Sequence, residues 1–467
     1  MDGNDIVIDG GVSVTLPDNG AIYFPPHIVT VLKMLNDKGF EAFAVGGCVR
    51  DAKMGITPHD YDVCTDAETE DIKKVFDGFN VIETGIKHGT VTVLSGGKPI
   101  EITTYRIDGD YKDHRRPEKV IFTKSIEDDL KRRDFTVNAM AVSLDGRFCC
   151  AGDGVKDLKD GVIRCVGVAE NRFSEDALRI LRAMRFAARF GFEIEEETFR
   201  AMKCKRNLLA YISSERIFAE LSGLLLVEDG KRASRVLDIC KDIVSVIISE
   251  FKPAFNCDQS SRHHKYNVWQ HILHTLDNAE NDIFLRWALF LHDICKPYFM
   301  VVGIDGRGHF PGHDFYGAAV ARDILKRLKA PGELCENVYL LIKYHDLRLS
   351  PSRKNAAKIL QLMGEENALR LLKMMRCDIL AQSSFRQDEK LEMVELLEKN
   401  INKYIAEQSC LNVKDLCVGG SDIIALGIKP GPRIKEILNE LLESVIDGNV
   451  ENDRQQLLLL AEKIVKR

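Results

Sequence analysis

The chain has 467 residues, of which 45% are hydrophobic and 29% are charged. This length exceeds the roughly 250–300 residues that one hydrophobic core serves, so several domains are expected, and the composition excludes a collagen, a coiled-coil rod and a disordered chain. A net charge of −6 excludes a surface that is positive throughout, so a nucleic-acid partner would be held by local clusters of lysine and arginine.

The termini and the cysteines bear on the location of the protein. No apolar run approaches the ~18–20 residues that span a bilayer, and the first residues lack the basic flank and apolar stretch of a secretory signal. The thirteen cysteines are scattered and form no CxxC pair, which indicates reduced and mostly buried thiols. We expect a soluble, cytoplasmic protein without a membrane contact.

The pattern of apolar residues changes once along the chain. Up to about residue 165, short β-rich runs such as FEAFAV and GTVTVL alternate with Gly, Pro and Asp, which predicts a small α+β domain. From about residue 170, apolar residues recur at spacings of three and four, which predicts helices. The expected divisions are an N-terminal extension (1–20), a head (21–146), a neck (147–250), a second helical domain (251–385) and a C-terminal helical tail (386–467).

The first candidate site begins in the segment AFAVGGCVRD. A strand ending at Val45 is expected to run into Gly46 and Gly47, and a helix beginning near Cys48 would aim its backbone N–H groups at a phosphate. Arg50 would add a charge-assisted contact to the same phosphate. A double glycine alone more often marks only a tight turn.

Two aspartates follow shortly after this turn. Asp60 and Asp62 flank Tyr61 in a predicted short strand, so alternation places both carboxylates on one face. Two like charges this close need compensation, and Mg²⁺ prefers one or two carboxylates together with phosphate oxygens. Glu101, in the strand PIEITTYR, is a candidate third carboxylate. The site suits metal-assisted nucleotidyl transfer, and the alternative is a solvent-exposed acidic turn.

Two further segments carry clustered polar side chains. The segment LKRRDFTVNAMA gathers donors for phosphate and ribose in Arg132, Arg133, Asp134 and Asn138. The segment SEDALRILRAMRFAARFGF predicts a helix on which Asp176 and Arg179 share a face, and Arg182, Arg185 and Arg189 continue the same stripe.

The pair Asp176 and Arg179 suggests base selection. Cytosine and adenine both present an amino donor beside a ring-nitrogen acceptor, and a carboxylate beside a guanidinium is complementary to that pattern. Uracil and guanine present the opposite pattern. The alternative is a surface ion pair worth under about 1 kcal/mol.

In this order and spacing, GGCVRD, HDYDV, RRDFTVNAMA and EDALRILRAMRFA resemble the class II tRNA nucleotidyltransferases, or CCA-adding enzymes, and the related bacterial poly(A) polymerases. The resemblance covers about residues 20–225 and implies an α+β chain: a polymerase-β-like head with a mixed sheet, then a mostly helical neck and further helices. It implies addition of CCA to the tRNA 3′ acceptor end from CTP and ATP.

The resemblance also implies roles for single residues. Gly47 and Arg50 would contact the triphosphate and Asp60 and Asp62 would bind Mg²⁺. The nucleotide pocket would be lined by Arg133 or Arg132, Asp176, Arg179, Arg182 and Arg185. Residues 106–120 are similar to the mobile loop that switches complete CCA-adding members from C to A, which favours complete CCA addition.

A second ligand set occupies the helical half: His271, His292, Asp293, His313, His345 and Asp378. Histidines and carboxylates on separate helices suit a divalent transition metal that keeps a position open for water. Residues 252–385 resemble the HD-superfamily phosphohydrolases, and the HD domain fused to some bacterial tRNA nucleotidyltransferases has phosphodiesterase or phosphatase activity. The alternative for each histidine is a satisfied core residue.

Three other functions fit parts of this pattern. An A-adding enzyme or poly(A) polymerase shares every motif of the head. A metal phosphohydrolase would use the second site as its main activity, and a non-catalytic RNA-binding protein would use neither. Nothing in the sequence indicates an obligate protein partner.

Overall fold

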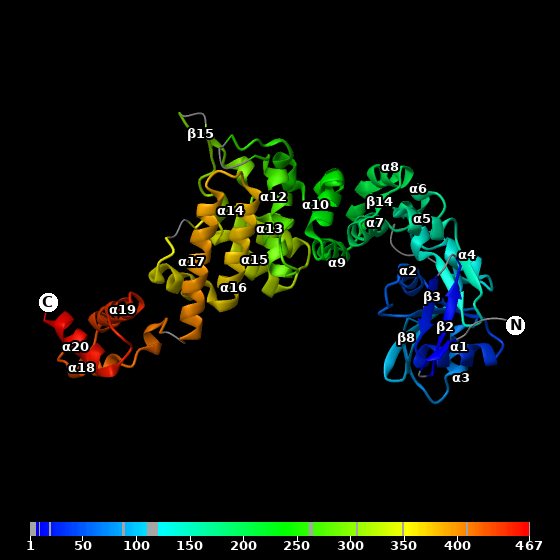
Figure 1. The fold of residues 1–467 in the computed structure, drawn as a ribbon, viewed down its shortest axis with the longest axis horizontal. Coiled ribbons are helices and arrows are strands. Elements are labelled where there is room, and N and C mark those ends of the chain that lie inside the picture. The colour runs from blue at the N-terminus through cyan, green and yellow to red at the C-terminus, as the bar shows by residue number, and fades with distance from the viewer. Residues whose placement is uncertain are drawn as a thin grey trace. The chain divides into compact units, whose positions relative to one another are not determined.

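The structure of the protein is a computed structural model. It describes residues 6–8, 10–17, 20–85, 89–109, 120–260, 265–304, 307–347, 350–407 and 410–466. The predicted switching loop therefore lies largely outside the described residues. The chain forms two compact units (Figure 1), of which one comprises Met1–Leu224 and Ile239–Ile247 and the other Leu225–Asp238 and Ile248–Arg467.

A mixed sheet forms the centre of the first unit. Its seven strands follow the order β12-β11-β4-β5-β8-β7-β6, and only β5 and β8 pair in parallel. The strands are β4 (Ala42–Val45), β5 (Asp62–Thr65), β6 (Asn80–Gly85), β7 (Thr90–Ser95), β8 (Lys98–Thr104), β11 (Met140–Ser143) and β12 (Phe148–Cys150). All four residues of β4 are buried, because this strand lies within the sheet and both of its faces are covered.

The register of this sheet places the acidic residues. Val45, the last residue of β4, pairs with Asp62, the first residue of β5. Val63 pairs with Ile102, so Glu101 of β8 lies next to Asp62 across the parallel pair. One edge of the sheet therefore gathers the glycine turn after β4 and two of the predicted carboxylates.

Smaller elements surround the sheet. The chain begins with an antiparallel sheet of β1 (Ile6–Ile8), β2 (Gly11–Leu16) and β3 (Gly20–Phe24), and β9 (Arg106–Asp108) pairs with β10 (Val120–Phe122). The helices are α1 (Pro26–Asp37), α2 (Gly47–Lys53), α3 (Thr69–Val75) and α4 (Ile126–Lys131). Ser125 caps α4, because its hydroxyl accepts the Asp128 N–H at 3.2 Å.

The segment after the sheet is mainly helical, as predicted. It contains the 3-10 turn η2 (Thr136–Asn138) before β11, and then α5 (Gly154–Asp160), β13 (Val162–Ile163), α6 (Ala169–Glu175), α7 (Leu178–Phe190), β14 (Glu193–Ile194), α8 (Glu196–Lys205), η3 (Arg206–Tyr211), α9 (Ser214–Leu225), α10 (Gly230–Ile239) and α11 (Lys241–Ile247). Gly191, at φ 71°, ends α7 in the left-handed conformation that glycine adopts readily.

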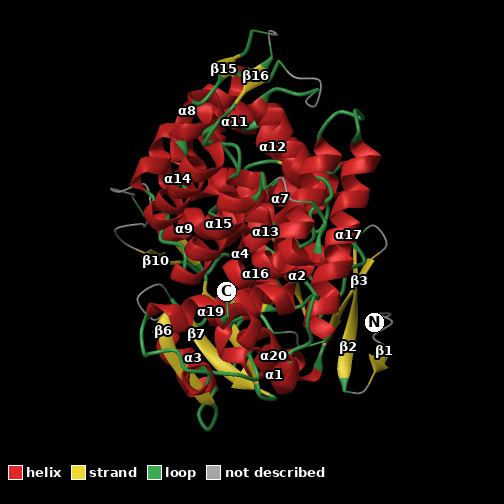
Figure 2. Cartoon of the chain, turned by 90° about the vertical axis from the view of Figure 1, so that its left-hand side faces the viewer, coloured by secondary structure: helices red, strands yellow, loops and turns green. Residues whose placement is uncertain are grey.

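The second unit is helical apart from one small strand pair, β15 (Val301–Val302) with β16 (Gly308–His309), among the described residues (Figure 2). Besides α10, which lies in this unit except for its last residue, its helices are η4 (Ser249–Asn256), α12 (Val268–Leu276), α13 (Ile283–Leu291), η5 (Lys296–Tyr298), α14 (His313–Arg327), α15 (Gly332–Tyr344), α16 (Arg353–Ala381), α17 (Gln387–Ala406), η6 (Val413–Asp415), α18 (Gly420–Ala425), α19 (Pro432–Ile446) and α20 (Arg454–Val465). Gly364, at φ 74°, kinks α16.

The predicted fold class is confirmed: a mixed sheet with helices is followed by a helical remainder. All thirteen cysteines are free, as expected. Within the described part of the chain, every helix is too short or too polar to cross a bilayer.

Candidate active site and candidate metal centre

Two arginines lie over the glycine turn between β4 and α2. Gly46 has φ 80°, and a Cβ at this position would lie 3.1 Å from the Arg133 Nη1 atom. A Cβ at Gly47 would lie 3.6 Å from the Arg50 Nη2 atom. β4 ends at Val45 as predicted, and α2 begins at Gly47, one residue before the expected start. The absence of side chains on the turn lets both guanidinium groups approach the backbone.

The acidic group lies beside this turn. The surrounding protein removes part of the hydration of Asp62 and so raises its pKa; Arg133 lowers it, and Glu101 and Asp60 raise it further. The carboxylates of these three residues therefore interact. Their oxygens do not form a group of three within 4.8 Å of one another, so a bound cation would complete its coordination with phosphate and water oxygens.

The prediction that Asp60 and Asp62 share one short strand is wrong. β5 begins at Asp62, and Asp60 precedes the strand. The reason lies in the register: Asp62 pairs with the last residue of β4, after which the chain turns away at Gly46, so β4 offers no partner to Asp60.

The predicted cluster around Arg132 and Arg133 contains a partner that the sequence interpretation missed. The carboxylate of Asp129, on α4, is fully buried and accepts from Arg132 at 2.8 and 2.9 Å and from Arg133 at 3.3 Å. Burial alone would raise the pKa of Asp129, but the two arginines lower it below its usual value. Arg132 is thus held against Asp129, whereas Arg133 also reaches Gly46 and interacts with Asp62.

A chain of polar contacts joins the glycine turn to α7. Arg50 donates to the Asn138 side chain at 2.5 Å, and Asn138 donates to Asp134 at 3.3 Å. Asp134 in turn accepts from Arg182 at 2.9 Å. Four residues predicted from three separate motifs therefore form one network, whose members are buried or half-buried.

The network continues onto α9, which the sequence interpretation treated only as a helix. The buried Glu220 lies 2.6 Å from Arg185 and 3.7 Å from Arg182. Gly223, one turn further along α9, leaves room for Arg185, because a Cβ there would lie 2.7 Å from the Arg185 Cδ. The spacing of Arg216 and Glu220 by four in the segment ERIFAE was the available signal.

The placement of Asp176 on one helix with Arg179 is also wrong. The helix breaks at Asp176, which is extended at φ −134° and ψ 103°, and α7 starts at Leu178. Asp176 Oδ1 accepts the Leu178 N–H at 3.0 Å, so the side chain caps the new helix.

The ion pairs around the break also differ from the predicted couple. Asp176 Oδ2 pairs with Arg216 at 2.8 Å, and Arg179 pairs with Glu175 at 2.8 Å. Arg179 further donates to the backbone carbonyl of Arg132 at 2.9 Å. Asp176 and Arg179 therefore flank the break between α6 and α7, and each has its own charged neighbour.

The second unit brings the other predicted ligand set together from five helices. His271 lies on α12, His292 and Asp293 follow α13, His313 begins α14, His345 follows α15, and Asp378 lies near the end of α16. Asn267 and Asp282 cap α12 and α13 with side-chain acceptors at 2.8 and 2.9 Å. Two groups of ligand atoms within 4.8 Å result, His271 with His292 and Asp293, and Asp293 with His313 and His345.

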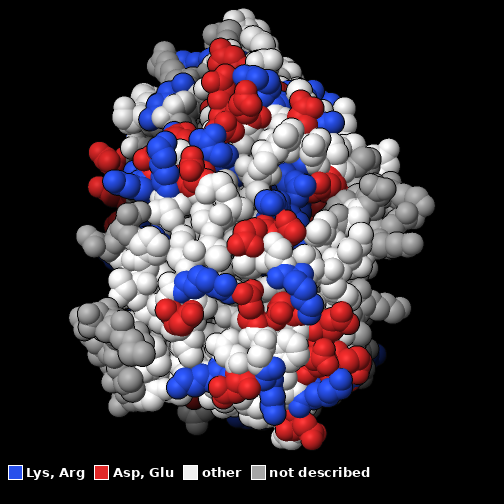
Figure 3. Space-filling model, turned by 90° about the vertical axis from the view of Figure 1, so that its right-hand side faces the viewer, with Lys and Arg blue, Asp and Glu red and all other residues white. Residues whose placement is uncertain are grey.

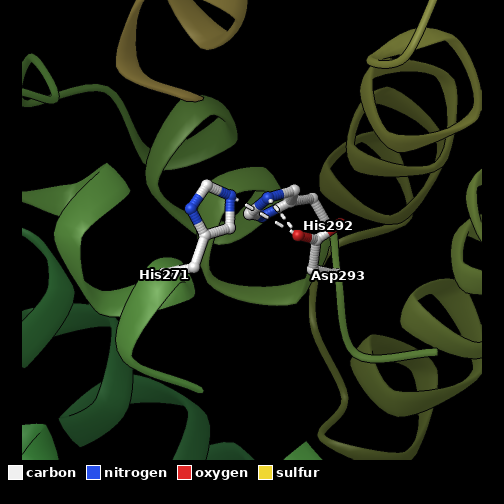
Figure 4. A group of neighbouring side chains, drawn as sticks. All are labelled: His271, His292 and Asp293. Carbon is white, nitrogen blue, oxygen red and sulfur yellow. Dashed lines mark ion pairs between the residues drawn. The ribbon is translucent and has the colours of Figure 1, made fainter. Parts of the chain in front are cut away.

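Asp293 belongs to both groups through different oxygens. Its Oδ2 lies 3.2 Å from His292 Nε2 and 3.5 Å from His271 Nε2 (Figure 4). Its Oδ1 lies 3.5 Å from His313 Nε2 and 3.6 Å from His345 Nε2. Asp378 Oδ1 lies 2.8 Å from His271 Nε2 and closes the first group. All six predicted residues are thus brought together.

Three of these histidines have a fixed ring orientation. The Nδ1 atoms of His292, His313 and His345 each lie 2.7 Å from a backbone carbonyl three residues earlier. A carbonyl can only accept, so Nδ1 carries a proton and Nε2 is the ring atom that faces Asp293 and would bind a metal once it is deprotonated. The buried Nε2 atoms of His292 and His313 have no hydrogen-bond partner among the described residues, which fits a metal-binding arrangement.

The electrostatics of the group favour a cation. Burial lowers the pKa of His292, but Asp293 and Asp378 outweigh it and raise the pKa to about 9. The Lys296 ammonium lies 2.6 Å from Asp293 Oδ2, a contact that the sequence interpretation missed. On the molecular face drawn in Figure 3, lysine and arginine are interspersed with aspartate and glutamate.

Sequence comparisons fit this geometry. The poly A polymerase head domain family matches residues 42–164, the family described as the probable RNA- and SrmB-binding site of polymerase A matches residues 191–241, and domain 2 of tRNA nucleotidyltransferase matches residues 316–461. A CCA-adding enzyme of Lactobacillus delbrueckii subsp. bulgaricus is 34% identical over 91% of this chain and 94% of its own length. The chain belongs to the CCA-adding enzyme family.

Solved structures of CCA-adding enzymes share the fold. The Bacillus stearothermophilus CCA-adding enzyme in complex with CTP superposes with a TM-score of 0.68 at 26% identity and covers 94% of this chain and 97% of its own. The Thermotoga maritima CCA-adding enzyme complexed with tRNA has a TM-score of 0.59 at 21% identity, with 93% and 94% covered, and supports the fold alone. The glycine turn and the acidic edge lie within the head-domain match, and the α6–α7 break lies between that match and the one over residues 191–241.

Proposed function

We propose that this chain adds CCA to the 3′ end of tRNA from CTP and ATP. The observation that carries the proposal is the position of Asp62, whose carboxylate interacts with Asp60 and Glu101 and faces Arg133 beside the glycine turn. Family membership and the kinship with a CTP-bound CCA-adding enzyme support the choice of nucleotides.

The protein groups would divide the work of nucleotidyl transfer. Arg50 and Arg133, above Gly47 and Gly46, would hold the triphosphate and balance the charge of the departing pyrophosphate. Asp60 and Asp62, with Glu101 beside them, would hold Mg²⁺, which when bound lowers the pKa of the attacking tRNA 3′ hydroxyl and offsets charge on the α-phosphate. The partly dehydrated, mutually repelling carboxylates fit this ion.

Asp176 and Arg179 would select cytosine and adenine. The ion pairs with Arg216 and Glu175 support this role, because they hold the two side chains in place on either side of the break. A base would add to the contacts that both side chains already make, since a carboxylate oxygen can accept more than one hydrogen bond. Arg182 and Arg185, held by Asp134 and Glu220, would form the adjoining wall of the pocket.

A single assay tests this function. Pure protein is incubated with tRNA that lacks its CCA end and with each labelled nucleoside triphosphate in turn, and the product length is resolved on a gel. The proposal expects incorporation from CTP, then from ATP, and termination after CCA. A-only products or long poly(A) tails would support the rival polymerases, and incorporation of UMP or GMP, or none, would defeat the proposal.

We propose as a second function that the HD-type site in the second unit hydrolyses phosphoesters with a divalent transition metal. Two overlapping ligand groups that share Asp293 carry this proposal, since one carboxylate oxygen faces each histidine pair. A bound metal would supply a water of lowered pKa. The histidines would bind the metal through Nε2, and Lys296 would orient the shared carboxylate.

The second function is tested separately with bis(p-nitrophenyl) phosphate in the presence of Mn²⁺, Co²⁺ or Ni²⁺. Hydrolysis that depends on the added metal is expected. A purified protein that contains no bound transition metal and hydrolyses nothing with any of the three ions would contradict it.

The division into five segments with boundaries near residues 20, 146, 250 and 385 remains a prediction.

A further inference from the structure

We infer that the N-terminal sheet β1–β3 positions the two aspartates of the transfer site through Tyr61; the inference rests on the proposed role of Asp60 and Asp62 in holding Mg²⁺. Tyr61 lies between them and immediately before the first paired residue of β5. Ladder pairing of β4 with β5 starts only at Asp62, so Asp60 and Tyr61 need another restraint.

The side chain of Tyr61 provides this restraint. Its hydroxyl donates to the backbone carbonyl of Tyr23 at 2.6 Å. Its ring lies 6.3 Å from the ring of Phe24, which is fully buried. Tyr23 and Phe24 belong to β3 and pair with Ser13 and Val12 of β2, so the accepting carbonyl is part of a hydrogen-bonded sheet.

The same sheet contacts the helix that follows the glycine turn. The Lys53 ammonium, at the end of α2, donates to the backbone carbonyl of Pro17, and the Lys53 side chain runs past Gly20. α2 also carries Gly47 and Arg50. One small sheet therefore contacts both the acidic segment and the phosphate-facing helix, although it precedes residues 42–164, which the head-domain family covers.

The restraint matters because Asp60 and Asp62 repel each other. Without the Tyr61 hydrogen bond, residues 60–62 would shift so that the two carboxylates lie further apart. A cation would then have to bring the carboxylates together again, and the free energy of that change would lower its affinity. Tyr61 would thus act through the two aspartates, as a positioning residue. Removing only its hydroxyl should weaken cation binding at this site by about three- to tenfold, the size expected for one hydrogen bond.

The test is a Mn²⁺ titration of the full chain without nucleotide or tRNA, followed by the electron paramagnetic resonance signal of free Mn²⁺. Wild type, Tyr61→Phe, Tyr23→Phe and Asp62→Ala are compared. Tyr23→Phe is the matched control. It removes a phenolic hydroxyl from β3, the strand whose backbone carbonyl accepts from Tyr61, and it keeps that carbonyl. Asp62→Ala identifies the Mn²⁺ that belongs to the transfer site, and the rest belongs to the HD-type site.

We expect Tyr61→Phe to raise the dissociation constant of the Asp62-dependent Mn²⁺ three- to tenfold, with the remaining Mn²⁺ and the melting temperature unchanged. Tyr23→Phe should match the wild type. Equal affinity in Tyr61→Phe and wild type, or parallel weakening at both sites, would overturn the inference. If Asp62→Ala binds Mn²⁺ as the wild type does, the proposed cation role of Asp62 fails, and the inference fails with it.

Discussion

Asp62 is the residue at which the charges of the transfer site meet. The Arg133 side chain, which lies over the glycine turn, lowers the pKa of this carboxyl, while the negative charges of Asp60 and Glu101 raise it. The Asp62→Asn substitution keeps the shape of the side chain and removes its charge. We expect CMP addition to fall by at least about a thousandfold, because several kcal/mol of transition-state stabilisation are lost.

The measurement is single-turnover CMP addition, with tRNA affinity determined in parallel. tRNA binding should stay within about twofold, since this carboxylate would repel rather than attract the RNA backbone. Asp77→Asn, at an exposed aspartate after α3, is the control and should leave both quantities unchanged. A parallel loss of transfer and tRNA affinity would contradict a catalytic role for Asp62.

Asp176 allows a second test at the residue scale. An asparagine can still accept the Leu178 N–H, but its amide adds a donor that complements a uracil carbonyl. We expect Asp176→Asn to raise the ratio of UMP to CMP incorporation by about tenfold or more, measured by competition between the two triphosphates. A uniform loss of rate with every nucleotide would indicate that Asp176 serves only the fold.

At the scale of elements, the buried Asp129 carboxylate of α4 forms ion pairs with two arginines that directly follow the helix. Asp129 neutralises Arg132 and Arg133, which are themselves mostly covered. We expect Asp129→Asn to lower the free energy of unfolding at pH 7 by about 2–4 kcal/mol, because both arginines lose their counter-charge. Urea denaturation measures this change.

The pH dependence of that difference has a definite sign. The arginines lower the pKa of Asp129 in the folded state, so its contribution is complete above the unfolded value of about 3.9 and is lost as the pH falls through the folded value. The gap between wild type and Asp129→Asn should therefore narrow as the pH falls below about 4. A gap that widens in acid would contradict the assignment.

Elements with local signals were predictable from the sequence. β4, the glycine turn and α2 lie in one short stretch, and their residues determine each other's conformation. The break at Asp176 was not predictable from periodicity, because the apolar spacing runs through it from α6 into α7. The helix breaks there because the Asp176 carboxylate caps α7 and pairs with Arg216, which lies 40 residues away in sequence.

At the scale of the whole molecule, the two candidate sites lie in different compact units. Asp293→Asn should abolish metal-dependent hydrolysis of bis(p-nitrophenyl) phosphate and leave CMP addition within about twofold. Both activities are measured on the same preparation, with Asp323→Asn on the exposed face of α14 as the control. Loss of both activities together would indicate that the variant unfolds or that the sites are coupled.

The second site illustrates how far sequence interpretation reaches at this scale. Its six ligands were recognised by residue type and by the adjacent His292 and Asp293, although they span more than a hundred positions. The sharing of Asp293 between two ligand groups and the contact with Lys296 were not foreseen. Both depend on how five helices pack against one another, which spacing along the chain does not specify.

The three imidazole rings that contact backbone carbonyls three residues earlier have a further consequence. Each ring is oriented by a backbone carbonyl three residues earlier and not by the ion that it would bind. The backbone therefore determines the shape of the centre before any ion binds. A chelator could then strip this centre without loosening its walls, and the apoprotein would reload by simple exchange with the medium. The identity of the resident ion would follow from cellular supply rather than from the history of folding.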